Sequence, residues 1–278
     1  MSENKEAQRT LEKTTGERFG RLWAPYDTAL FEDSVGLFSR RLVASGFDTS
    51  WFRGKRCLDA GCGGGRNSVA MARLGASEVV GIDVGEEGIR NAQERASGLP
   101  NVRFQVGSLL DLPFADASFD LVWCAGVLMH TADEERALDE LVRVLRPGGY
   151  LYLLVYATGG LRWPLIQWLR PLAAAIGESA VQDAMRDANL PANKRRTFLD
   201  DLFTPRIYFY DWVVVERMLR SRGMTRVERW DPETRFDHEE SLAAYRGDLE
   251  DLLRLFSIDS WPDAVRPLAE ASRDMVRR

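Results

Sequence analysis

The stretch that decides the fold is Leu58-Asp59-Ala60-Gly61-Cys62-Gly63-Gly64-Gly65-Arg66. It follows a short apolar run and precedes a helical pattern that begins at Arg66. The glycines at alternate positions 61, 63 and 65 permit positive φ angles and let the backbone approach a ligand closely. The next helix directs its N-terminal amides at the same place. The stretch therefore predicts a ligand-binding turn between a strand and a helix.

On both sides of this turn, short apolar segments alternate with helical ones. The predicted strands are Arg56–Asp59, Glu78–Asp83, Val102–Val106, Phe119–Cys124 and Tyr150–Tyr156, and a helix over 211–221 followed by a strand Thr225–Trp230 resumes the alternation. Such alternation predicts an α/β fold with a mostly parallel, doubly wound sheet and helices on both faces. Right-handed crossovers fix its topology.

The periodicity also divides the chain into four parts. Residues 1–50 are predicted as an N-terminal helical cap, and residues 51–157 with 206–238 as the core of the fold. Residues 158–205 interrupt the alternation after the fifth strand and are predicted to form a helical lid over the carboxyl edge of the sheet. Residues 239–278 are predicted to be helical again.

Composition excludes several classes of function. The net charge of −5 gives no long-range positive field, so we expect no nucleic-acid partner. Three cysteines without a C-x-x-C pair predict neither a disulfide framework nor a metal site. No apolar run reaches the roughly 18–20 residues that span a bilayer, and the N-terminus lacks an apolar signal core, so we expect a cytoplasmic protein. The oligomeric state stays open.

Two carboxylates narrow the choice of ligand. A nicotinamide-binding turn, G-x-G-x-x-G, would need a glycine where this chain has Arg66. Asp59 would repel a pyrophosphate, but it suits a cationic ligand that carries an amino group and a sulfonium. Asp83 ends the second strand, where a carboxylate can accept hydrogen bonds from both ribose hydroxyls. The pattern favours a sulfonium nucleoside over a nicotinamide cofactor.

At this point the chain resembles the class I, Rossmann-like S-adenosylmethionine-dependent methyltransferases, and among them the small-molecule enzymes. Four blocks carry the resemblance: Leu58–Gly65, Gly81-Ile82-Asp83, Leu112-Pro113-Phe114 with Ser118–Val122, and Arg143–Gly149. It implies a seven-stranded type of sheet and S-adenosylmethionine as the cofactor. The residues that it implies as cofactor contacts are Trp23, Tyr26, Asp59, Gly61, Cys62, Gly63, Asp83, Val84, Ser108, Leu109, Cys124 and Ala125.

The loop after the third strand departs from that family. Its members usually place an aspartate there, which accepts a hydrogen bond from the adenine amino group, whereas this chain has Ser108. A hydroxyl also accepts such a bond, but more weakly than a carboxylate does. Leu109 would contribute its backbone amide and an apolar contact to the ring.

His130 and Tyr156 are the candidate catalytic residues. Family members that methylate planar amines carry Asn/Asp-Pro-Pro-aromatic after the fourth strand, and the sequence Cys124-Ala125-Gly126-Val127 disfavours that chemistry. His130 is interpreted either as a general base or polar substrate contact, or as a structural residue that caps the helix beginning near Asp133. Tyr156 ends the fifth strand, where strand ends face the ligand.

Several aromatic residues permit two interpretations. Trp23 and Tyr26 either form a lid over the cofactor or pack the first helix into the core. Four further aromatic residues are predicted to line or brace an apolar, ring-bearing acceptor: Trp163, Trp168, Tyr208 and Tyr210.

The sequence therefore predicts an enzyme that methylates an O, N or C nucleophile of a small metabolite, such as a natural-product, lipid-like or sugar intermediate. Two alternatives stay open: a protein or RNA acceptor, and a regulatory domain that binds S-adenosylmethionine without catalysis. A nicotinamide oxidoreductase is the remaining alternative for the fold.

Overall fold

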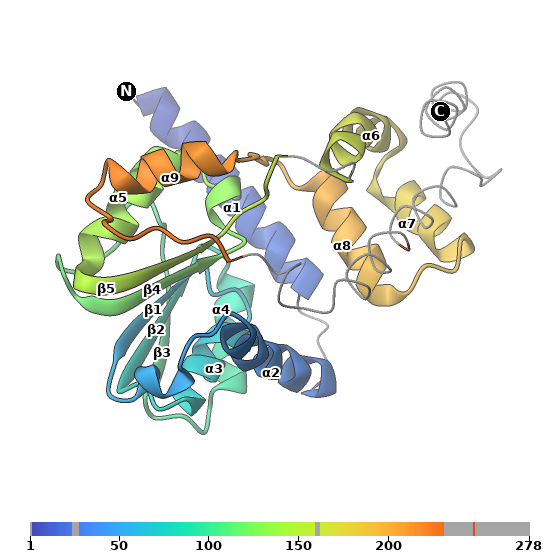
Figure 1. The fold of residues 1–278 in the computed structure, drawn as a ribbon. Helices are drawn as coiled ribbons and strands as arrows, with labels where there is room; N and C mark the ends of the chain where they lie inside the picture. Colours follow the sequence, from blue (N-terminus) through green and yellow to red (C-terminus); the bar gives the residue numbers. More distant parts are fainter. Residues whose placement is uncertain (1, 24–27, 159–161, 231–246, 248–278) are drawn as a thin grey trace. The chain divides into compact units, whose positions relative to one another are not determined.

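A computed structural model describes residues 2–23, 28–158, 162–230 and Gly247 (Figure 1). The chain divides into two compact units. The first unit combines Met1–Ala157 with Pro205–Trp230, and the second combines Thr158–Thr204 with Asp231–Arg278. No helix in the described ranges is long and apolar enough to cross a bilayer.

The first unit contains a five-stranded sheet. Its strands are β1 (Arg56–Ala60), β2 (Glu78–Asp83), β3 (Val102–Val106), β4 (Phe119–Ala125) and β5 (Leu145–Leu154). They are ordered β3-β2-β1-β4-β5, and every pair is parallel. The five strands predicted up to residue 156 are therefore confirmed, although β5 begins earlier than expected. The central strand β1 is buried apart from its first residue, as expected for a strand covered on both faces, and Asp59 is the charged residue among its buried ones.

Helices cover both faces of this sheet (Figure 1). The helical elements of the first unit are α1 (Ser2–Trp23), α2 (Thr28–Ala44), η1 (Thr49–Phe52), α3 (Arg66–Arg73), α4 (Glu86–Arg95), η2 (Leu128–His130), α5 (Glu134–Val144) and α9 (Trp212–Arg220). One apolar core lies between the sheet and α2 with α3, and contains Phe38 and Met71. The other lies against α5 and α9, and contains Leu138 and Leu219. The two cores confirm the doubly wound α/β class.

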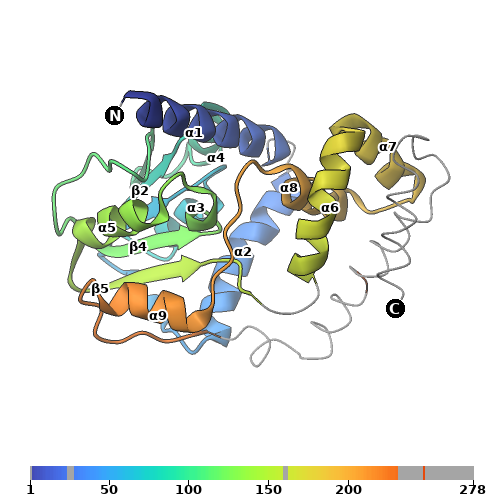
Figure 2. The same cartoon turned by 90° about the horizontal axis from the view of Figure 1, so that it is seen from above.

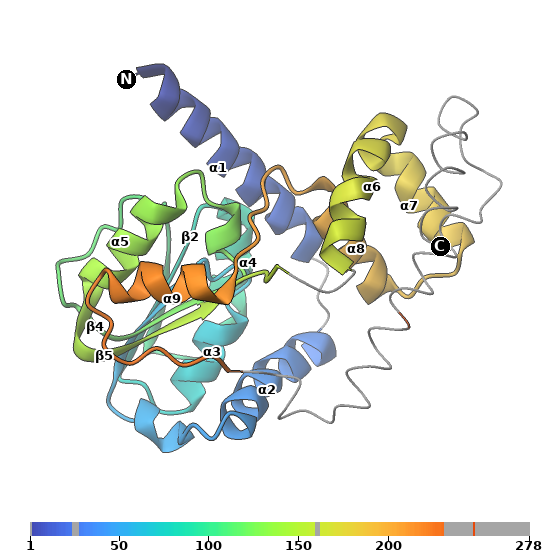
Figure 3. The same ribbon diagram turned by 45° about the horizontal axis from the view of Figure 1, so that its top comes forward.

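Helix α1 packs against α4, at the carboxyl edge of β2 (Figures 2 and 3). Gly16 and Gly20 lie four residues apart and share one face of α1. A Cβ atom on Gly16 would lie 3.0 Å from the backbone of Gly85, and one on Gly20 would lie 3.2 Å from the side chain of Glu87. The two glycines therefore permit the close approach of the two helices.

The predicted strand Thr225–Trp230 is wrong, because these residues have no ladder pairing in the structure. Trp230 instead lies against an aromatic cluster on β5 and the loop after α2, with its ring 5.5 Å from that of Tyr152 and 6.1 Å from that of Phe47. The physical reason lies in the sequence that follows: a strand here would pair in a hairpin with 231–238, which is poor in strand formers and contains Pro232. Residues 231–238 lie outside the described residues.

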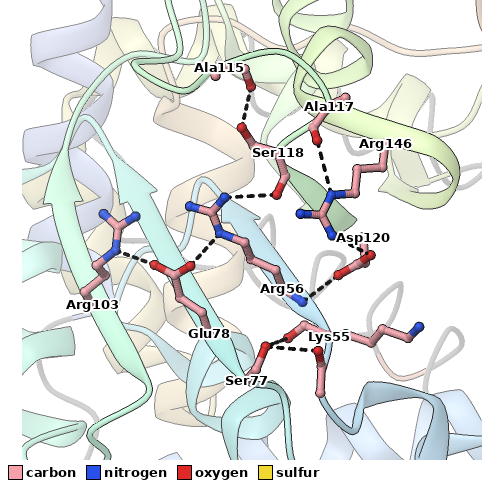
Figure 4. A network of polar contacts seen from close by, with 11 residues as sticks. Lys55, Arg56, Ser77, Glu78, Arg103, Ala115, Ala117, Ser118, Asp120 and Arg146 are labelled. Atoms are coloured by element: carbon pink, nitrogen blue, oxygen red, sulfur yellow. Dashed lines mark hydrogen bonds and ion pairs between the residues drawn. The ribbon is translucent and has the colours of Figure 1, made fainter.

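Ion pairs join the amino ends of the strands on the opposite edge of the sheet (Figure 4). Glu78 accepts from Arg56 Nε at 2.5 Å and from Arg103 Nε at 2.9 Å, so that it links β1, β2 and β3. Asp120 accepts from the backbone N–H of Arg56 at 2.8 Å and from Arg146 at 3.1 Å. The charged residues at this edge connect neighbouring strands and so have a structural role. The carboxyl edge of the sheet is the edge on which we expect the ligand.

The second unit contains three described helices, α6 (Arg162–Ile176), α7 (Glu178–Asp187) and α8 (Ala192–Phe203). Arg170 donates to the carbonyl oxygens of Asp201 at 2.7 Å and Thr204 at 2.5 Å, which satisfies the end of α8. The predicted lid is therefore helical. Its position over the sheet stays a prediction, as does the helical C-terminal part, which lies almost wholly outside the described residues.

Candidate functional site

The candidate site lies at the carboxyl edge of β1 to β4, where the sequence placed it. The turn after β1 adopts the conformation that its glycines permit, with φ of +79° at Gly61 and +50° at Gly63. A Cβ on Gly61 would lie 2.3 Å from Val127, so this glycine is required by packing against the loop after β4. A Cβ on Gly63 would meet nothing within 4 Å. The backbone at Gly63 is thus open for close approach of a ligand.

Asp83 connects the turn after β1 to the start of α4. Its carboxylate accepts from the N–H of Gly63 at 2.9 Å and from the N–H of Gly85 at 2.8 Å. Each carboxylate oxygen has a second lone pair, so two acceptor positions are left for ribose hydroxyls. Burial raises the pKa of Asp83, although the N–H groups of Gly85 and Gly63 oppose that change. The side chain both orders the turn and offers acceptors at its rim.

Asp59 is the one carboxylate on the central strand, and it is 1% exposed. Ser68 on α3 donates to its Oδ2 at 2.6 Å. Its Oδ1 has no hydrogen-bond partner among the described residues, which is costly for a buried oxygen. Burial raises the pKa of Asp59 from 3.8 to about 7, against the opposing effect of Ser68. A cationic amino group would satisfy Oδ1 and favour the charged form, so these residues fit S-adenosylmethionine.

The remaining predicted cofactor contacts differ in how far they are buried. Val84 and Ala125 are half-buried at the ends of β2 and β4, and Leu109 is buried below the end of β3. Cys62 and Cys124 are buried free thiols whose pKa values burial raises, that of Cys124 to about 12. Neutral thiols of this kind are unreactive. The two side chains are packed into the core, which leaves their backbone as the part that can contact a cofactor.

The side chains of the two predicted aromatic cofactor contacts, Trp23 and Tyr26, are outside the described part of the structure. Trp23 is the last residue of α1, and its side chain lies outside the described residues, as does the whole of Tyr26. Their predicted role as a lid stays a prediction. Trp163 and Trp168 belong to α6 in the second unit. Within the described residues no cluster of His, Cys, Asp and Glu could hold a metal ion.

His130 ends η2 and is buried beside the site. It does not cap the following helix, because Asp133 accepts from the N–H of Arg136 at 3.0 Å and is itself the N-cap of α5. His130 Nδ1 lies 2.8 Å from the carbonyl oxygen of Arg206. A carbonyl only accepts, so Nδ1 carries a proton, and whenever the ring is neutral its lone pair is on Nε2. This is the tautomer that a general base needs.

Aromatic side chains surround the imidazole of His130. The ring of Phe19 on α1 lies 5.1 Å away, and the ring of Tyr156 lies 5.7 Å away and edge-on. Tyr156 follows β5 and accepts, through its carbonyl, from the N–H of Tyr210 at 2.9 Å. The structure thus brings together the two predicted catalytic residues and one of the predicted bracing residues.

Three residues of this site were missed by the sequence analysis: Glu12, Phe19 and Arg206. Glu12 accepts a short hydrogen bond from Ser108 Oγ. The spacing of Glu12, Gly16 and Gly20 at four-residue intervals was the available signal for a helix face that contacts the core. Arg206 acts through its backbone carbonyl, and no residue type signals such a role.

The fold and the site together define a nucleoside-binding α/β domain: an open parallel sheet, a glycine turn under a buried carboxylate, and a second carboxylate at the end of the next strand. Residues 58–153 match the family model described as a methyltransferase domain. Residues 58–153 are therefore a methyltransferase domain, which confirms the resemblance of this part of the chain to the class I S-adenosylmethionine-dependent methyltransferases.

Named relatives agree with this assignment. The chain is 39% identical over 124 residues to the O-methyltransferase rstn1 of Aspergillus nomiae, covering 43% of this chain and 55% of the relative. It is 38% identical over 158 residues to the 27-O-demethylrifamycin SV methyltransferase of Amycolatopsis mediterranei, covering 54% and 57%. The chain thus spans little more than half the length of these relatives. The crystal structure of the cyclase SpnF aligns with a TM-score of 0.50 at 24% identity, covering 87% of this chain and 75% of that one, and shows the same fold.

Proposed function

We propose that this protein transfers the methyl group of S-adenosylmethionine to a hydroxyl oxygen of a small, ring-bearing metabolite. The observation that carries the choice of oxygen is the hydrogen bond between His130 Nδ1 and the Arg206 carbonyl. A neutral hydroxyl must lose its proton as its oxygen is methylated, and a fixed imidazole with its lone pair on Nε2 accepts that proton. Two relatives named above are O-methyltransferases by name or by substrate, in agreement with this choice.

We assign cofactor binding, proton transfer and exclusion of water to different residues of the chain. When bound, S-adenosylmethionine supplies an electrophilic methyl group on a sulfonium. Asp59 and the turn at Gly61 and Gly63 would hold its methionine portion, and Asp83 its ribose. His130 takes the acceptor proton on Nε2 and is held in place by Arg206, while Tyr156 and Phe19 exclude water from the imidazole. Alignment in a dry site supplies most of the acceleration of such a displacement.

A small acceptor also suits the charge of the molecule. The net charge of −5 disfavours an RNA acceptor, and the aromatic side chains beside His130 favour a ring-bearing apolar compound. The two alternatives, a protein acceptor and a non-catalytic regulatory domain, both predict cofactor binding without methylation of a small molecule.

Calorimetry with S-adenosylmethionine and S-adenosylhomocysteine tests the cofactor, and mass spectrometry of a panel of phenols and hydroxylated polyketides tests the transfer. We expect micromolar binding of both cofactors and a product 14 Da heavier than its acceptor. His130→Gln should bind S-adenosylhomocysteine as the wild type does and lose about 10²–10⁴-fold in kcat, the usual contribution of a general base. Binding without any methylated small molecule would favour a protein acceptor or a regulatory domain over the proposal, and absence of binding would refute it.

A further inference from the structure

We infer that Glu12, on the N-terminal helix, supplies the carboxylate that recognises the adenine amino group of the cofactor. The inference rests on the proposed function and adds a specificity-determining residue to it. Relatives of this class usually carry the carboxylate in the loop after the third strand, where this chain has Ser108. In the structure a carboxylate reaches the same place from the N-terminal helix. Glu12, which is 96 residues from Ser108 in the sequence, accepts a short hydrogen bond from Ser108 Oγ through its Oε1.

The bonding of Ser108 shows why the pair is a better acceptor than a lone hydroxyl. Ser108 Oγ donates its only proton to Glu12 and accepts from the N–H of Leu110 at 3.0 Å. One lone pair on Oγ is left, and donation to a carboxylate makes that oxygen more negative. Glu12 also keeps its second carboxylate oxygen, and no described residue forms an ion pair with it. An exocyclic amino group with two protons fits these acceptors.

The packing of α1 explains how a residue so distant in the sequence reaches this place. Glu12, Gly16 and Gly20 share one face of the helix at intervals of four residues. Gly16 lies against the backbone of Gly85, two residues after Asp83, the residue expected to hold the ribose. Glu12 lies one helical turn away from Gly16 and contacts Ser108, which follows β3. The same helix face therefore passes from the expected ribose position to the expected adenine position.

The test compares two ligands that differ only at the group in question. S-adenosylhomocysteine has the 6-amino group, and its 6-deamino analogue, with unsubstituted purine as the base, has only a hydrogen there. Calorimetry on the full chain should show that the wild type prefers the adenosine compound by at least tenfold. Glu12→Ala should weaken binding of S-adenosylhomocysteine by about 10–100-fold, the range for a hydrogen bond to a charged group, and leave binding of the 6-deamino analogue unchanged.

Three controls keep the result specific. Glu17 lies on the exposed side of the same helix, and its Oε1 is 3.9 Å from Lys13 Nζ. Glu17→Ala removes this carboxylate and should leave the affinities for both ligands unchanged. Asp83→Ala should weaken both ligands alike, because both have the same ribose. Ser108→Asp introduced into the Glu12→Ala variant should restore the preference for adenosine, because it returns a carboxylate to the loop after β3.

The outcomes separate this inference from the proposed function. If Glu12→Ala keeps the wild-type preference, or loses both ligands equally, Glu12 does not read the amino group and the inference is overturned. The isosteric Glu12→Gln variant, with its melting temperature measured, gives the same comparison if the alanine variant does not fold. If the wild type binds neither S-adenosylmethionine nor S-adenosylhomocysteine, the proposed function itself fails.

Discussion

The buried carboxyl of Asp59 makes cofactor binding sensitive to pH, and Asp59→Asn removes that sensitivity. The pKa of Asp59 is raised from 3.8 to about 7 because the residue is buried on the central strand. That difference corresponds to a cost of the order of 4 kcal/mol for ionising the side chain in the free protein above pH 7. A bound ammonium group beside Oδ1 favours the ionised form, so binding below pH 7 must release the proton.

Two quantities follow from this linkage. At pH 6 about nine in ten free molecules carry the proton, so the apparent Kd of S-adenosylhomocysteine should be about tenfold higher than at pH 8. Calorimetry at pH 6 in two buffers of different ionisation enthalpy should report release of nearly one proton per ligand bound. Asp59→Asn should bind more weakly at pH 8 and lose the pH dependence. The reasoning is refuted if the variant keeps the wild-type slope, since Asp83 would then be the titrating group.

The stability of the ligand-free protein should fall as the pH rises, whereas its affinity for the cofactor should increase. The pKa of Asp59 is higher in the folded than in the unfolded chain, so the protonated carboxyl stabilises the fold below pH 4 and this contribution is lost as the pH rises to about 7. Ligand-free Asp59→Asn should therefore gain stability relative to the wild type between pH 5 and pH 8. Thermal unfolding at the two pH values measures this gain, which has the cost of ionisation given above as its upper limit.

Three further predictions concern the supports of the site. Gly61→Ala should cost about 1–3 kcal/mol in urea unfolding and weaken cofactor binding, because its φ is +79° and its Cβ would strike Val127; an unchanged midpoint would contradict this. Asp133→Ala should cost about 1 kcal/mol through loss of the N-cap of α5, and Asp133→Ser should recover most of it. Glu78→Gln should cost at most about 1 kcal/mol at pH 7, because Glu78 and Arg56 are about one-third exposed and Arg103 is nearly half exposed. Arg103 and then Arg56 hold the pKa of Glu78 below 4.5, so this difference should disappear as the pH falls below that value; equal losses at pH 3 and pH 7 would refute it.

The sequence by itself determined the central strands and the turn that follows β1. Apolar runs, glycine spacing and the Asp133 cap are local signals, because the conformation that each residue permits depends on its near neighbours. For the same reason the placement of Asp59 and Asp83 at the ends of adjacent strands followed from the order of elements. The strand expected at 225–230 failed because an outer strand depends on its pairing partner more than on its own residues.

Only the tertiary structure decided which distant groups complete the site. Glu12 meets Ser108 across 96 residues, and His130 receives its tautomer from a backbone carbonyl 76 residues later. Neither pairing has a spacing rule, because both depend on how closely helices and loops pack after the sheet has formed. The glycine turn and its two carboxylates indicate the cofactor from local chemistry. The packing of α1 places Glu12 where we expect the adenine, and the segment at Arg206 orients His130, which we expect to face the acceptor.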